Sequence, residues 1–220
     1  MPELTRTDAV FVLDLGDDEN RFAPAWLEAV TAHLDTVVAG AEPAALVTVG
    51  GGKFYSNGLD LEWLAGHGDE GDRYVAAVHE LLARMLSLPV PTIAAVNGHA
   101  FGAGAMLAMA HDFRLMRADR GYFCFPEVDI GIPFTPGMAA LLQSKLTPAA
   151  AVASMTTGRR FGGPQAAELG LVDGTVTQDA LVTAATESVA ALAGKDRGTL
   201  AAIKSTMFAP ALATLREHGN

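Results

Sequence analysis

Cysteine is almost absent from this chain, and its scarcity excludes two kinds of structure. The 220 residues include one cysteine, Cys124, so an internal disulfide and a metal site built from several cysteines are both excluded. Two phenylalanines flank Cys124, and no histidine lies close to it in sequence. We therefore expect a buried, inert thiol, because a nucleophilic cysteine needs a neighbouring group that activates it.

Positive charge is also scarce. The chain has 15 Lys and Arg against 25 Asp and Glu, which gives a net charge of −10. A protein that binds nucleic acid needs a basic face to neutralise phosphates, and none is visible in the sequence, so we expect no nucleic-acid partner. An anionic small molecule held by a few local cations is compatible with this charge.

Long apolar runs are missing as well. The longest apolar segment, residues 100–110, is far shorter than the roughly 20 residues that cross a bilayer. The first residues show no charged-then-apolar leader pattern. We therefore expect no membrane association and a cytoplasmic location. Half of the residues are hydrophobic and 18% are charged, a composition that predicts a single domain with a large core over residues 1–220.

Strand-like and helix-like segments alternate along the chain. This order predicts an α/β fold in which helices cover a mainly parallel sheet. After about residue 145 we expect a helical region that runs to the end of the chain. Apolar and β-branched runs predict strands at 9–15, 45–49, 92–96, 113–116 and 122–125, and helical patterns predict helices at 24–38, 73–88, 103–110, 179–192 and 200–208.

One joint between a predicted strand and a predicted helix is rich in glycine. Residues 97–106 read NGHAFGAGAM, and the glycines permit tight turns and close approach of another backbone. A helix beginning there would present unpaired N–H groups and the positive end of its dipole. Such a joint either packs a strand tightly against a helix or holds an anion.

A second glycine-rich loop follows another predicted strand. Residues 50–61 read GGGKFYSNGLDL. This is no phosphate-binding P-loop, because Phe54 stands where that motif needs Ser or Thr, and neither loop has the GxGxxG spacing of dinucleotide-binding sites. Two backbone donors on separate loops can converge on one carbonyl oxygen and form an oxyanion hole.

Four ordered motifs give the chain a resemblance to the enoyl-CoA hydratase/isomerase (crotonase) superfamily over about residues 9–208. The first loop is similar to the family's F-x-x-G-x-D, with one extra residue after Phe54, and the second to its N-G-x-x-x-G-x-G. A Pro-Glu followed by a Gly-rich turn lies in 125–133 (FPEVDIGIP), and 166–173 (AAELGLVD) is similar to A-x-x-x-G-L-V-D.

The resemblance implies a fold of stacked βαβ units over about 1–145, followed by the helical region over about 146–220. It implies an acyl-CoA thioester substrate, with coenzyme A as part of that substrate and no permanently bound cofactor, and a homotrimer or dimer of trimers. It assigns the oxyanion hole to the backbone N–H groups of Leu59 and Ala103. The substrate-binding residues that it implies are Lys53, Ser56, Asn57, Gly58, Phe101, Gly102 and Met106.

The carboxylates near these loops decide which reaction the resemblance implies. Family hydratases carry two glutamates that hold a water, and the two matching positions here are Met106 and Glu127. Hydration needs both groups, whereas moving a proton from C2 to C4 needs one base that can take it and return it. The pattern is most similar to the short Δ3,Δ2-enoyl-CoA isomerases, with Glu127 as the proton shuttle. Asp129 is a rival base, because on a strand it would share a face with Glu127.

Other polar residues have simpler interpretations. We expect Asp60 to cap a helix that begins at Leu61, and neither His99 nor His111 has a partner at metal-ligand spacing, so no metal site is expected. Lys53 and Lys204 are candidates for contacts to the phosphates of coenzyme A, against the alternative that each is simply solvated.

Three functions therefore compete. The leading prediction is isomerisation of 3-enoyl-CoA to trans-2-enoyl-CoA. The second is another enzyme on the same scaffold, such as a hydratase, a thioester hydrolase or a decarboxylase, since one carboxylate and an oxyanion hole could serve each of these reactions. The third is a non-catalytic acyl-CoA-binding subunit that has kept the fold.

Overall fold

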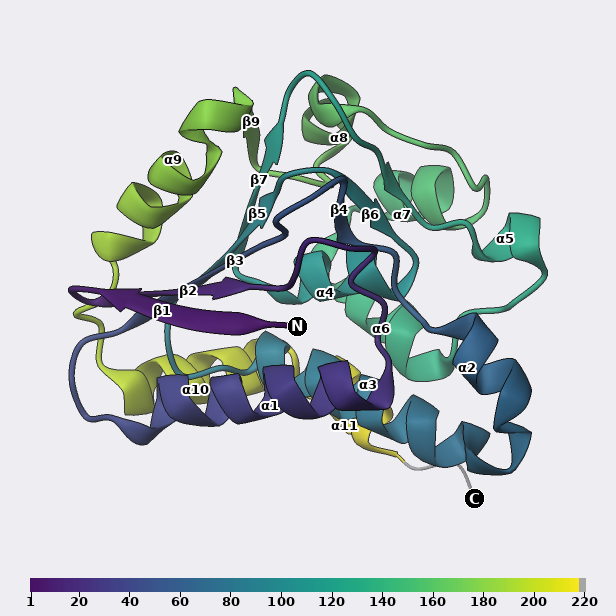
Figure 1. Ribbon diagram of the computed structural model, residues 1–220, viewed down its shortest axis with the longest axis horizontal. Coiled ribbons are helices and arrows are strands. Elements are labelled where there is room, and N and C mark those ends of the chain that lie inside the picture. The colour runs from purple at the N-terminus through teal and green to yellow at the C-terminus, as the bar shows by residue number, and fades with distance from the viewer. Residues whose placement is uncertain (218–220) are drawn as a thin grey trace.

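A six-stranded sheet forms the centre of the computed structural model, which describes residues 1–217 (Figure 1). Its strand order is β1-β2-β3-β5-β7-β9. β1 pairs antiparallel with β2, and all the other neighbours are parallel. The strands are β1 (Glu3–Thr7), β2 (Val10–Asp14), β3 (Ala45–Val49), β5 (Thr92–Val96), β7 (Phe113–Arg117) and β9 (Gly174–Val176).

A second, parallel sheet holds three short strands in the order β4-β6-β8. They are β4 (Phe54–Ser56), β6 (His99–Phe101) and β8 (Phe123–Cys124). Each follows a strand of the large sheet: β4 follows β3, β6 follows β5 and β8 follows β7. The chain therefore winds as stacked turns, and each turn gives one strand to each sheet.

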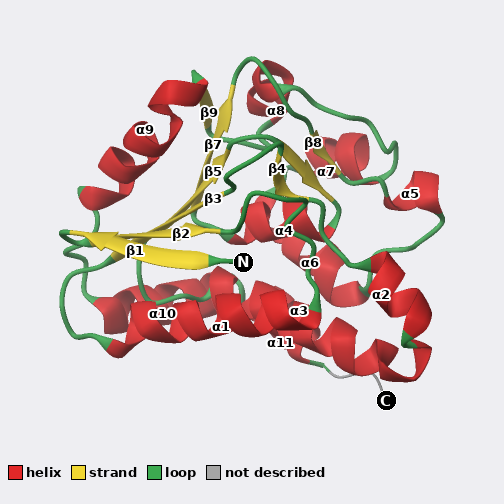
Figure 2. Cartoon of the chain, in the orientation of Figure 1, coloured by secondary structure: helices red, strands yellow, loops and turns green. Residues whose placement is uncertain are grey.

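Helices cover both faces of the large sheet (Figures 1 and 2). α9 packs on one face, where Leu181, Ala185 and Val189 meet residues of β2, β3 and β5. The main core lies on the other face, beneath the remaining long helices. The helices are α1 (Pro24–Ala39), α2 (Leu61–Gly66), the 3₁₀ turn η1 (Gly68–Glu70), α3 (Gly71–Leu86), α4 (Ala103–Ala110), α5 (Glu127–Ile130), α6 (Pro136–Lys145), α7 (Pro148–Met155), α8 (Gly163–Leu169), α9 (Gln178–Ala190), α10 (Arg197–Met207) and α11 (Ala209–Arg216).

The predicted α/β class with a mainly parallel sheet is confirmed, and most predicted elements are present within a few residues of their expected bounds. Three differences matter. β4 and β6 lie inside the two glycine-rich segments, which we had interpreted as loops. β9 joins the large sheet from the region expected to be helical. Glu127 begins a short helix, so the strand on which Asp129 would share its face does not exist.

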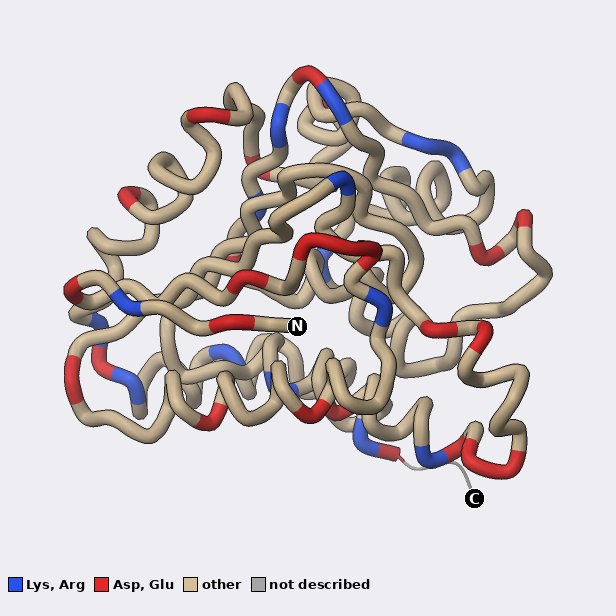
Figure 3. The backbone as a smooth tube through the Cα atoms, in the orientation of Figure 1, with Lys and Arg blue, Asp and Glu red and all other residues tan. Residues whose placement is uncertain are grey.

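Charge is unevenly distributed over the molecule (Figure 3). Acidic residues line the loop that precedes α1, at Asp17, Asp18 and Glu19, and surround the turn before α3. Within residues 1–217, no helix is long and apolar enough to cross a membrane.

Candidate functional site

The second glycine-rich segment ends at the start of α4. Gly102 precedes this helix with φ +51°, a left-handed conformation that favours glycine. A Cβ at Gly102 would lie 3.4 Å from Oε1 of Glu127, so the carboxylate sits beside this turn. The amide of Ala103, the first residue of α4, donates to no acceptor within the described part of the chain, as is usual for the first turn of a helix.

The first glycine-rich loop meets the same helix end. Gly58 has φ +78°, and a Cβ there would lie 2.8 Å from the backbone nitrogen of Ala103. Only glycine permits this approach. Leu59 follows, and its amide likewise donates to no acceptor among residues 1–217. Leu59 and Ala103 line the same cavity, so the two loops bring two free amide groups to one place.

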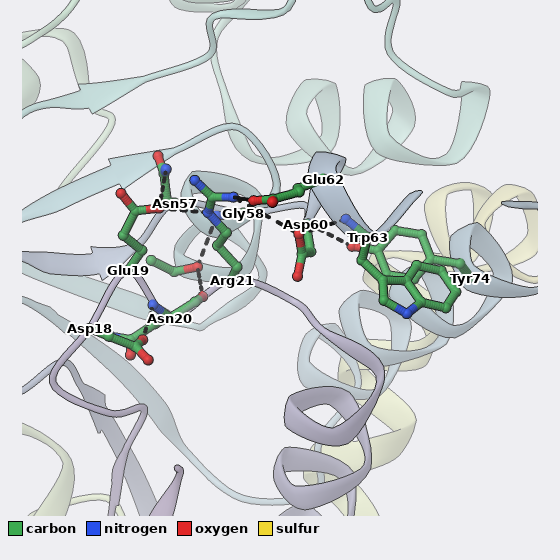
Figure 4. Close-up of polar contacts among 11 residues, drawn as sticks. Asp18, Glu19, Asn20, Arg21, Asn57, Gly58, Asp60, Glu62, Trp63 and Tyr74 are labelled. Carbon is green, nitrogen blue, oxygen red and sulfur yellow. Dashed lines mark hydrogen bonds and ion pairs between the residues drawn. The ribbon is translucent and has the colours of Figure 1, made fainter. Parts of the chain in front are cut away.

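Residues before α1 hold the first loop in position (Figure 4). The hydroxyl of Ser56 donates to the carbonyl of Asn20 at 2.7 Å and accepts the amide of Gly58 at 3.1 Å. The amide of Asn57 donates to the carbonyl of Glu19 at 2.8 Å. Ser56 is fully buried, so its hydroxyl shapes the loop and does not face the cavity.

The cavity has a volume of about 340 Å³ and a largely apolar wall. Arg21 and Glu127 are the charged residues among those that line it. Its apolar walls come from α2, α3, α4, α6 and the segment after α5. Among the lining side chains are Leu64, Val75, Met106, Ile132, Phe134 and Met138.

Glu127 is the carboxylate of this cavity. Its side chain is buried, with 8% of the residue exposed, and Oε2 has no hydrogen-bond partner in the described structure. Burial raises the pKa of Glu127 to about 7, since a desolvated carboxylate disfavours its charged form. Asp129, the rival base, is exposed and does not line the cavity. The prediction that the two carboxylates share a face is therefore wrong, because both lie on helix α5 and not on a strand.

Arg21 is the charged residue of this cavity that sequence reasoning missed (Figure 4). Its Nε donates to Oε2 of Glu19 at 2.6 Å, and its Nη1 lies 3.9 Å from carboxylate oxygens of Asp60 and Glu62. Arg21 reaches the site because its backbone bridges to Gly58. No motif or periodicity in the loop marks this long-range pairing.

The structure brings seven of the predicted site residues to the cavity and leaves three away from its wall. Lining residues are Asn57, Leu59, Phe101, Gly102, Ala103, Met106 and Glu127. Ser56 and Gly58 support the loop behind it. Lys53 is exposed, and its ammonium lies 5.2 Å from the ring centre of Phe54.

The alternative that Lys204 contacts a phosphate is wrong. Lys204 is 3% exposed, its Nζ lies 2.6 Å from Oδ2 of Asp112, and it also donates to the carbonyls of Leu88 and Val90. All three ammonium protons are therefore used inside the protein.

The remaining polar candidates have structural roles. Oδ1 of Asp60 accepts the amide of Trp63 at 3.0 Å, which confirms the predicted helix cap. Cys124 is buried, and burial raises the pKa of its thiol to about 11, as expected of an inert cysteine. His111 is fully buried between Thr48 and the carbonyl of Leu107, and burial lowers its pKa to about 3. Residues 1–217 contain no group of three side chains suited to a metal ion.

Several known proteins are similar to this chain in sequence or in fold. A sequence model described as enoyl-CoA hydratase/isomerase matches residues 5–218. Enoyl-CoA delta isomerase 3 of Arabidopsis thaliana is 39% identical over 79% of this chain and 76% of that protein. Carnitinyl-CoA dehydratase of Citrobacter koseri is 37% identical over 73% of this chain and 61% of that protein. A solved structure titled as the apo enoyl-CoA isomerase of Mycobacterium tuberculosis has a TM-score of 0.91 at 28% identity, over 99% of this chain and 95% of that one.

Proposed function

The chain belongs to the enoyl-CoA hydratase/isomerase family, and from this premise we propose that it isomerises 3-enoyl-CoA to trans-2-enoyl-CoA. Coenzyme A would enter and leave as part of the substrate, with no permanently bound cofactor. Similarity to delta isomerases over most of the chain supports this reaction.

Two backbone amides would stabilise the intermediate. Removing a proton from C2 of a thioester places negative charge on the carbonyl oxygen. The amides of Leu59 and Ala103 line one cavity and lack acceptors within residues 1–217, so both are available to that oxygen. Each donor of this kind contributes ~3–4 kcal/mol to transition-state stabilisation.

Glu127 would move the proton. Its unpartnered Oε2, buried beside the turn at Gly102, is the observation that carries the proposal. The carboxylate would take a proton from C2 and return it to C4. With its pKa raised to about 7 by burial, Glu127 can both accept and donate that proton near neutral pH. By the family resemblance, Met106 stands where a hydratase has the first of its two glutamates, and a methionine side chain cannot hold a water.

We also propose which residue contacts a phosphate of coenzyme A and how copies of the chain assemble. Lys53, exposed in the first loop just before β4, makes no ion pair with any residue of 1–217 and would contact a phosphate. By the family resemblance we also propose a homotrimer or dimer of trimers, which light scattering of the purified protein would measure directly.

Parallel assays with 3-enoyl-CoA and trans-2-enoyl-CoA test the reaction. We expect conversion of 3-enoyl-CoA to raise the absorbance of the conjugated thioester product. Hydration of trans-2-enoyl-CoA should be at least tenfold slower than this isomerisation. Hydration as fast as isomerisation would overturn the proposal in favour of a hydratase. Binding without turnover of either substrate would favour a non-catalytic acyl-CoA-binding protein.

A further inference from the structure

A second cavity lies apart from the candidate active site. It is a groove of about 480 Å³ between α6, α10 and the start of β7, and none of its lining residues lines the first cavity. Its apolar walls include Phe113, Leu192, Leu200, Ile203, Met207 and Phe208. Three of these side chains face solvent in part: Met207 is 64% exposed, Ile203 49% and Phe113 41%. The groove is therefore open to a ligand with an aliphatic chain.

Four cations lie in or beside this groove. Lys204 pairs with Asp112 at 2.6 Å, and Arg114 pairs with Asp173 at 3.1 Å. Lys195 is exposed. Lys145, at the end of α6, makes no hydrogen bond or ion pair with any described residue. Its Nζ lies 4.9 Å from the centre of the Phe208 ring. An unpaired amine on an apolar wall is a candidate nucleophile.

The surroundings of Lys145 favour its neutral form. The pKa of Lys145 is lowered to about 8, mainly by burial and then by the charges of Arg114 and Lys204, while Asp112 and Asp173 act in the opposite direction. Roughly a fifth of the amine is then unprotonated at pH 7.5, against about one part in a thousand for an ordinary lysine. Lys195, which is exposed and lines the same groove, provides an internal comparison.

We propose that Lys145 is a site of acylation by acyl thioesters, whose aliphatic chain lies in the groove. The amine attacks the thioester carbonyl carbon, the C–N bond forms, and the C–S bond breaks. The coenzyme leaves as a thiolate and takes up the proton lost by the amine, so the products are an amide and a free thiol. The step needs no oxidant or reductant, and it does not depend on the reaction proposed for the first cavity.

Peptide mapping by mass spectrometry tests the site. The whole protein is incubated with octanoyl-CoA, which carries no double bond to isomerise, and acylation is quantified at Lys145 and Lys195. We expect Lys145 to be acylated about tenfold faster than Lys195 at pH 7.5, because its amine lies on the apolar wall and is partly neutral, an advantage offset in part by the lower nucleophilicity of a less basic amine. The rate at Lys145 should rise with pH and level off above about pH 8, the value to which its pKa is lowered. Equal rates at the two lysines would overturn the proposal.

The role of the groove is tested with a shorter chain and one variant. With acetyl-CoA, the ratio of the acylation rate at Lys145 to that at Lys195 should be several-fold smaller than with octanoyl-CoA. Ile203→Asp, at a half-exposed position on the groove wall, should remove that chain-length effect while circular dichroism stays unchanged. An octanoyl preference that is absent in the wild type, or that survives in Ile203→Asp, would show that the chain does not lie in the groove.

Discussion

Burial of Glu127 lowers the stability of the folded protein when its carboxylate is ionised. The carboxylate lies in a cavity with apolar walls, and Oε2 has no partner within residues 1–217. A buried ionised group without a partner is destabilising, and proton transfer is one function for which an unpartnered carboxylate is needed. The same feature therefore predicts effects on both stability and rate.

The stability of the protein should depend on pH through this residue. Glu127 has a folded-state pKa of about 7 against 4.5 when unperturbed. A group whose pKa is higher in the folded state than in the unfolded state contributes stability that is fully present below the unfolded-state pKa. This stability is lost as the pH rises through the folded-state pKa. Glu127→Gln should thus be more stable than the wild type at pH 8, by up to about 3 kcal/mol. Urea unfolding at pH 8 and pH 4.5 measures this difference, which should disappear at the lower pH.

The rate of isomerisation should follow the same titration. A general base must be ionised to take the C2 proton, so kcat/KM should rise with pH up to about 7 and then level off, because burial raises the pKa of Glu127 to that value. A pH–rate profile measured with 3-enoyl-CoA checks this. A profile that is flat between pH 5 and 8 would assign the proton transfer to a group that titrates elsewhere.

Sequence motifs predicted Glu127 and Met106 but not Arg21. The first two lie at fixed offsets from glycine turns, so local spacing locates them. Arg21 lines the cavity because its backbone bridges to Gly58 on a distant loop. Ser56 was predicted from its place in a motif to bind substrate. The motif did not indicate that its hydroxyl donates to the backbone carbonyl of Asn20.

At the scale of elements, the site depends on how β4 and α4 meet. Gly58 approaches the first amide of α4 more closely than any residue with a Cβ could. The short strands β4 and β6 fix this approach by pairing in the small sheet. Apolar periodicity predicted α4 with its observed bounds, but strands of three residues beside glycines are too short to leave a periodic signal.

The amide of Ala103 should be necessary for catalysis. Ala103→Pro removes this donor at the first position of α4, where proline is tolerated in helices. We expect kcat to fall by ~10²–10³-fold, the usual effect of losing one oxyanion donor, with the circular dichroism spectrum retained. The matched variant Ala103→Ser keeps the amide and should remain within a few-fold of wild type. Equal activity of the two variants would remove Ala103 from the oxyanion hole.

At the scale of the whole molecule, a buried ion pair ties a late helix to the sheet. Lys204 on α10 reaches Asp112, just before β7, and the carbonyls of Leu88 and Val90, just before β5. The sequence predicted α10 but not this contact, because its partners are far apart along the chain. We infer that the contact stabilises the packing of α10 beside the starts of these strands.

Breaking this ion pair should destabilise the protein. Lys204→Met leaves Asp112 without its cation and two carbonyls without a donor, so the free energy of unfolding should fall by about 2–4 kcal/mol. Lys53→Met, at an exposed lysine that makes no ion pair with residues 1–217, should change it by less than about 0.5 kcal/mol. Urea denaturation of both variants measures the contrast, and equal stabilities would mean that the pair contributes nothing.

Whether Glu127 alone moves the proton can be tested by comparing two variants with the wild type. The measurement is kcat for conversion of 3-enoyl-CoA by the wild type, Glu127→Gln and Asp129→Asn. Glutamine keeps the size of the side chain but cannot act as a base, so kcat should fall by ~10²–10⁴-fold. Asp129→Asn changes an exposed carboxylate two residues away and should leave kcat within a few-fold of the wild type. Near-normal turnover by Glu127→Gln, together with loss of turnover in Asp129→Asn, would contradict the account.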